Sequence, residues 1–151
     1  MADLPSKSDF NPSGFCPDAG WAWGHFGGLS VDEAYRLFCT NPINFQEVFM
    51  FMGGVAFLYY FSVIERYVLE SRADVSNEYE VDAMSILAHC VKQHFDVPDT
   101  QIVASIRLRA IDLAAHVRKD ISQYSTEASE QNRISASWSE LHATLANTRN
   151  A

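Results

Sequence analysis

Residues 44–70 read NFQEVFMFMGGVAFLYYFSVIERYVLE, and this stretch decides the fold class. Asn44 is a favourable N-cap, so we expect a helix to begin there. Gly53-Gly54 is expected to end or kink that helix after about two turns. A second helix is then predicted from Val55 to about Glu70. Its apolar side chains cover nearly the whole circumference, which is typical of a helix at the centre of a fold.

The uncharged segment 48–64 must also be tested as a membrane span. It is shorter than the roughly 20 apolar residues that a spanning helix needs. Glu47 and Glu65 bracket it, and no basic flank sets an orientation. The sequence therefore predicts a buried core segment and no membrane insertion.

Helix signals continue on both sides of this stretch. Ser30-Val31-Asp32-Glu33 is a capping box, and Asn77 with Glu80 repeats the pattern. Asp99 is a favourable cap after Pro98. Apolar residues follow at helical spacing over 31–38, 81–95, 103–124 and 134–145, with no strand-like alternation of useful length. We predict an all-α bundle of five to six helices over residues 30–151.

Residues 1–29 differ in composition from the rest. Three of the five prolines and five of the seven glycines lie there. Such a stretch is expected to form a coil or turns, and its many aromatic side chains are expected to pack it on the helical body. The prediction is therefore one domain, with residues 1–29 as an aromatic-rich coil before the helices.

The charge of the chain indicates which class of partner it is suited to bind. The chain has 19 acidic and 11 basic residues, for a net charge of −8. A nucleic-acid-binding surface needs clustered positive charge, so we expect no nucleic acid partner. A cationic protein partner fits better, because long-range attraction speeds such an encounter.

The cysteines and the N-terminus indicate a compartment. Cys16, Cys39 and Cys90 form no CxxC pair and predict no disulfide framework or zinc knuckle. Reduced thiols fit the cytoplasm. The N-terminus lacks the basic start and apolar stretch of a signal peptide, so we expect a cytoplasmic protein.

The first candidate binding site is an acidic run. Like charges four residues apart on a helix repel one another, and a basic partner would relieve that repulsion. The alternative is a solvated helix end, where salt screens the charges. The residues concerned are Glu70, Asp74, Glu78, Glu80 and Asp82.

The second candidate is the aromatic-glycine run at 21–28. Trp21, Trp23 and Phe26 are suited to anchor a protein interface, because interface hot spots favour Trp. The alternative is that these rings fasten the N-terminal segment to the bundle, since exposed aromatic surface is costly.

Candidate chemistry is sparse. Cys90 and His94 are four residues apart on a predicted helix, but nothing nearby in sequence completes a zinc ligand set. Asp112 and His116 have the spacing of a base with its orienting carboxylate, and equally of a surface ion pair. No nucleophile elbow or phosphate loop occurs. We expect no metal, no cofactor and no enzyme activity.

The stretch FQEVFMFMGGVAFLYYFSVIERY, residues 45–67, resembles the core of small bacterial proteins with an "MGxxAFxYYxPxxxxYL"-like pattern. Ser62 stands where that pattern has proline. Some of these families resemble immunity proteins, which neutralise polymorphic or contact-delivered toxins. The resemblance covers fold-core residues and transfers no functional residue.

These observations rank three functions. The first is a cytoplasmic protein-binding protein, an immunity-type inhibitor that neutralises a cognate bacterial toxin by occlusion. The second is a self-associating helical module, a homodimer for example, built on the apolar seam from Val103 to Tyr124. The third is a small-molecule or metal-dependent enzyme around Cys90, His94 and His116.

Overall fold

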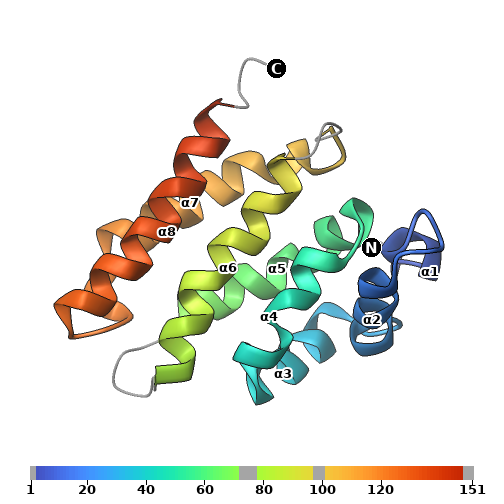
Figure 1. Cartoon of the computed structure of the whole chain (residues 1–151), viewed down its shortest axis with the longest axis horizontal. Coiled ribbons are helices and arrows are strands. Elements are labelled where there is room, and N and C mark those ends of the chain that lie inside the picture. Colours follow the sequence, from blue (N-terminus) through green and yellow to red (C-terminus); the bar gives the residue numbers. More distant parts are fainter. Residues whose placement is uncertain (1–2, 72–77, 97–100, 148–151) are drawn as a thin grey trace.

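A computed structural model describes residues 3–71, 78–96 and 101–147 of the chain, with the side chains of 78–80 and 101–102 left out. The described part is all-α, as predicted, but it holds eight α-helices where five to six were expected (Figure 1). The elements are α1 (Lys7–Phe10), α2 (Pro17–Phe26), α3 (Val31–Thr40), α4 (Pro42–Phe51), α5 (Gly54–Glu70), α6 (Glu78–Asp96), the 3-10 helix η1 (Gln101–Ile106), α7 (Arg107–Lys119), the 3-10 helix η2 (Ile121–Gln123) and α8 (Ala128–Asn147).

The N-terminal segment is the main correction, because residues 1–29 contain α1 and α2 instead of a coil. Ser6 and Asp9 form a capping box that starts α1. Pro17 occupies the first turn of α2, where its missing N–H costs nothing. Burial of Phe26 and of two alanines on one face of α2 outweighs the low helix propensity of its glycines.

The hinge between α4 and α5 also differs in detail from the prediction. Asn41, not Asn44, caps α4, because its side chain accepts a hydrogen bond from the Asn44 backbone N–H. Gly53 separates the two helices, and its N–H donates to the Phe10 carbonyl at 2.9 Å. A Cβ at Gly53 would lie 2.3 Å from the Asp9 carbonyl oxygen. This position therefore requires glycine so that α1 can lie against the turn.

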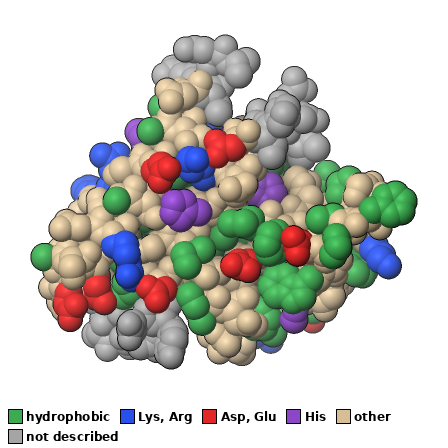
Figure 2. Space-filling view, in the orientation of Figure 1, with side chains coloured by type: hydrophobic (Ala, Val, Ile, Leu, Met, Phe, Trp, Pro, Cys, Tyr) green, Lys and Arg blue, Asp and Glu red, His purple; other side chains and the backbone are tan. Residues whose placement is uncertain are grey.

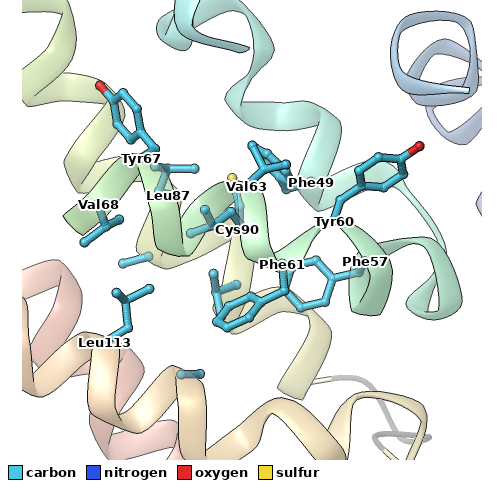
Figure 3. Packing of buried hydrophobic residues seen from close by; sticks show 14 of the residues in the cluster. Phe49, Phe57, Tyr60, Phe61, Val63, Tyr67, Val68, Leu87, Cys90 and Leu113 are labelled. Atoms are coloured by element: carbon cyan, nitrogen blue, oxygen red, sulfur yellow. The ribbon is translucent and has the colours of Figure 1, made fainter. Parts of the chain in front are cut away.

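Helix α5 contacts α1, α3, α6, α7 and η1, which agrees with the central place predicted for residues 55–70. Helix α4 packs on α2 and α6, and α8 packs on α6 and α7. Side chains of α4, α5, α6 and α7 meet in a shared core (Figure 3), among them Phe49, Val63, Leu87 and Leu113. The helices form a bundle around this core.

The apolar seam predicted from Val103 to Tyr124 is divided among η1, α7 and η2. All its members are buried within the chain except Ile121, which is half-buried. The Tyr124 hydroxyl donates to the Val68 carbonyl of α5 at 2.9 Å. The seam therefore packs inside the molecule and presents no apolar face to a second copy.

Across the described residues, no helix combines the length and the apolar character needed to cross a bilayer. The apolar helix α5 has 17 residues and a buried face made of large side chains.

Candidate protein-binding surface

Helices α2 and α4 lie side by side and carry a row of aromatic rings at the surface. The Trp21 ring lies 6.2 Å from Phe51 and 4.7 Å from His25, between ring centroids. His25 in turn lies 5.4 Å from Phe45. We call Trp21, His25, Phe45 and Phe51 the aromatic surface. Figure 2 shows hydrophobic side chains gathered over this part of the molecule, with acidic side chains among them.

Trp21 is the most accessible member of the aromatic surface, at 37% exposure. The other three are half-buried. Phe15, just before α2, is 90% exposed. Full exposure of aromatic side chains costs free energy in water, and Trp and Phe are frequent anchors of protein interfaces. Exposed apolar surface of this kind is therefore typical of an interaction site.

The structure separates the three aromatic residues that the sequence had grouped. Trp21 is exposed, whereas Trp23 is half-buried with its ring 5.3 Å from Phe10. Phe26 is completely buried and packs on Phe49, at 5.5 Å between centroids. Phe26 is therefore a core residue, and Trp23 packs against the core.

The sequence did not identify His25, Phe45 or Phe51 as site residues. Trp21 and His25 share a helix face because they are four residues apart. The prediction of a coil over this segment does not place them on one face. Phe45 and Phe51 were assigned to the core as part of an apolar helix. Only the packing of α2 on α4 brings the four rings together.

Two carboxylates belong to the same helix rows as the aromatic surface. Asp18 precedes Trp21 by three residues on α2, and Glu47 precedes Phe51 by four on α4. Residues at these spacings are neighbours on a helix surface. Asp18 and Glu47 are both exposed. The aromatic surface is therefore flanked by negative charge on both helices.

Two glycines lie beside Trp21 in the sequence of α2. A Cβ at Gly20 or at Gly24 would meet nothing within 4 Å, so packing does not require glycine at either position. Glycine inside a helix costs roughly 0.5–1 kcal/mol relative to alanine. Helix α2 is thus less stable than its surroundings permit, and the space beside Trp21 stays open.

The acidic run is partly neutralised within the chain. Glu70 accepts a 2.5 Å hydrogen bond from the Tyr35 hydroxyl and lies 3.5 Å from Arg66. Asp82 pairs with Arg133 of α8 at 2.5 Å. Asp74 lies outside the described residues, as do the side chains of Glu78 and Glu80. The two members whose side chains are described therefore stabilise contacts between helices of the chain itself.

The three residues grouped as a possible enzyme site, Cys90 and His94 on α6 and His116 on α7, have structural roles. The buried Cys90 thiol donates to the Gln46 carbonyl at 3.3 Å, and burial raises its pKa to about 12. His94 Nε2 lies 2.6 Å from the Phe49 carbonyl oxygen. His116 is on α7 and pairs with Asp120 at 3.4 Å, not with Asp112. Within the described ranges, no three His, Cys, Asp or Glu side chains are grouped to hold a metal ion.

No protein-family model matches this chain. No curated protein and no solved structure matches it either.

Proposed function

We propose that this chain is a protein-binding protein that occludes a cationic protein partner, in the manner of an immunity-type inhibitor of a cognate toxin. The observation that carries the proposal is the aromatic surface, where exposed Trp21 adjoins three further rings on two packed helices. The packing of α2 on α4 places these rings together before any partner arrives, which lowers the conformational entropy lost on binding.

The charge of the molecule supports the same function. A net charge of −8 attracts a basic partner over a distance and raises the association rate at low ionic strength. The apolar rings then supply the short-range contact that slows dissociation. An inhibitor that acts by occlusion needs both properties and no chemistry of its own.

The test is affinity capture from the protein's own cell extract, with three forms of the tagged chain. Wild type is compared with Trp21→Ala and with Leu108→Ala, a matched control that removes an exposed apolar side chain on α7. We expect wild type and Leu108→Ala to retain one stoichiometric basic protein, and Trp21→Ala to lose it. Co-expression of the wild-type chain should then suppress the growth defect that the captured protein causes.

Two outcomes would contradict the proposal. Equal capture by all three forms would remove the aromatic surface from the binding site. Recovery of the chain alone, with a dimer that Trp21→Ala dissociates in sedimentation analysis, would assign the aromatic surface to self-association.

A further inference from the structure

The aromatic surface lies in a part of the chain that has almost no basic side chains. Between residues 8 and 65 the sequence contains one Lys or Arg, Arg36, and α2 and α4 contain none. Arg36 forms an ion pair with Asp32 on its own helix, α3. The same helices α2 and α4 expose Asp18 and Glu47. No Lys or Arg of α2 or α4 therefore lies beside the rings and carboxylates of this surface.

Elsewhere the molecule completes the same combination with its own arginines. The Arg66 guanidinium carbon lies 3.9 Å over the Tyr35 ring, and Arg66 also pairs with Asp32 at 2.9 Å. A cation over an aromatic face and beside a carboxylate gains from both the ring quadrupole and the opposite charge.

The second example joins α5 and α7. The Arg109 guanidinium carbon lies 5.2 Å from the centre of the Phe61 ring, and Arg109 pairs with Glu65. In both examples a guanidinium bridges two helices by contacting a ring and a carboxylate. Helices α2 and α4 present a tryptophan, the best ring for this contact, together with two carboxylates.

We propose, on the basis of the function proposed above, that the partner anchors on this surface through an arginine-bearing segment. A guanidinium of this segment lies against the Trp21 indole, and its basic side chains pair with Asp18 beside Trp21 and with Glu47 beside Phe51. Arginine fits better than lysine, because a planar guanidinium stacks on a ring while it donates several hydrogen bonds to carboxylates. The absence of a side chain at Gly24, three residues after Trp21, leaves room for this approach.

In this proposal the carboxylates that attract the partner are those of α2 and α4, and not those of the acidic run. Glu70 and Asp82 are engaged by Arg66 and Arg133, so a partner would have to displace those contacts. Neither α2 nor α4 has a Lys or Arg that could compete in this way for Asp18 or Glu47.

The experiment titrates the full chain with a hexa-arginine peptide and, separately, with a hexalysine peptide. The readout is the indole N–H resonance of Trp21, assigned by its loss in Trp21→Phe, and the dissociation constant. The test variant is Asp18→Lys/Glu47→Lys. Its matched control is Asp112→Lys/Glu140→Lys, which changes the net charge equally at exposed positions on α7 and α8.

We expect hexa-arginine to shift the Trp21 resonance and to bind more tightly than hexalysine. Reversal of Asp18 and Glu47 should weaken binding about tenfold. The control reversal should weaken it about twofold or less, through the change in net charge alone. A Trp21→Leu variant, which keeps an apolar side chain without a π face, should also bind hexa-arginine more weakly.

The proposal is overturned if the control reversal weakens binding as much as the test reversal. It is also overturned if the Trp21 resonance does not move. These results are separable from failure of the proposed function. If the natural partner is captured equally by wild type and by Asp18→Lys/Glu47→Lys, the arginine anchor is wrong and the binding function stands. If no partner is captured but the peptide results hold, the proposed binding function is wrong and the arginine-binding surface stands.

Discussion

The two halves of the chain contribute different types of residue to the shared core. Nine of the ten Phe, four of the six Tyr and two of the three Trp precede residue 72. Eight of the eleven Lys and Arg lie at residue 72 or after it. We refer to residues 3–71 (α1–α5) as the aromatic half and to residues 78–147 (α6–α8) as the aliphatic half. Of the six exposed large hydrophobic side chains among the described residues, five lie in the aromatic half.

The difference shows in how rings are used. In the aromatic half, rings pack edge to face in a chain of contacts, such as Phe38 on Phe49 and on Tyr67. In the aliphatic half, α6 and α8 meet mainly through smaller side chains around the buried Trp138, whose indole N–H donates to the Met84 carbonyl at 3.0 Å. One half buries its tryptophan completely, and the other leaves Trp21 at the surface.

This contrast teaches that exposure of Trp21 is not forced by the fold. The chain can bury a tryptophan fully and satisfy its donor, as Trp138 demonstrates. The aromatic half keeps the exposed Trp21 on α2, a helix with two interior glycines that packing does not require. Sequence features that lower stability without serving the fold are expected at functional sites.

The largest expected difference in stability between the two halves is that between substitutions of their tryptophans. Trp138→Ala should destabilise the protein by about 3–5 kcal/mol, because it leaves a large cavity and removes the hydrogen bond from the indole to the Met84 carbonyl. Trp21→Ala should cost about 1 kcal/mol or less, since the side chain is already partly in water. Chemical denaturation followed by circular dichroism measures both values. Similar losses for the two variants would show that Trp21 is a core residue.

The second prediction compares two glycines of the aromatic half. Gly53→Ala should destabilise by about 1–3 kcal/mol, because the new Cβ collides with the Asp9 carbonyl where α1 meets the α4–α5 turn. Gly24→Ala should instead stabilise by about 0.5–1 kcal/mol, because its Cβ enters open space in a helix. The midpoints of thermal unfolding give the two signs. A loss of stability in Gly24→Ala would mean that α2 is held by something other than the contacts described.

How far the sequence predicts this fold depends on how local the signals are. The Ser30–Glu33 capping box is present as predicted, with both of its hydrogen bonds. The apolar residues of α5 correctly indicated a central helix. Helix α2 was missed, because its glycines argue against a helix and only burial against α4 and α5 overrides that preference.

The candidate site was predictable only in part, for the same reason. Trp21 could be selected from residue type alone, but Phe26 could not be assigned to the core without the partner helices. Two of the partners of the acidic run, Arg133 and Tyr35, are distant in sequence and so could not be predicted. Arg133 is 51 residues from Asp82, and Tyr35 is 35 residues from Glu70. Neither helical periodicity nor the number of charged residues predicts contacts between residues so far apart in the sequence.

His94 of the aliphatic half contacts two helices of the aromatic half, α4 and α5. It projects from α6 in the aliphatic half and its ring stacks on Phe57 of α5, at 3.9 Å between centroids. Its Nε2 hydrogen is donated to the Phe49 carbonyl near the end of α4, at 2.6 Å. That carbonyl lies in the last turn of a helix, where the backbone supplies few donors. The imidazole of the aliphatic half therefore caps the C-terminal end of α4 in the aromatic half.

Burial holds the pKa of His94 below its ordinary value of about 6.5, against a smaller opposing effect of the Phe49 hydrogen bond. In the unfolded chain this histidine takes up a proton near pH 6.5, whereas in the folded protein it stays neutral to lower pH. The unfolded state therefore binds more protons as the pH falls below about 6.5, and the folded state loses stability. Above that pH the histidine is neutral in both states and makes no pH-dependent contribution.

We expect the free energy of unfolding of the wild-type protein to fall between pH 7 and pH 5 with a contribution from His94 of at most about 1.4 kcal/mol per pH unit, the limit for one proton. His94→Gln keeps a hydrogen-bond donor but cannot titrate, so its unfolding free energy should depend less steeply on pH over the same interval. Denaturation at half-unit pH steps compares the two slopes. Parallel curves would mean that His94 takes up its proton at the same pH in the folded and unfolded states, so that the junction between the two halves admits water.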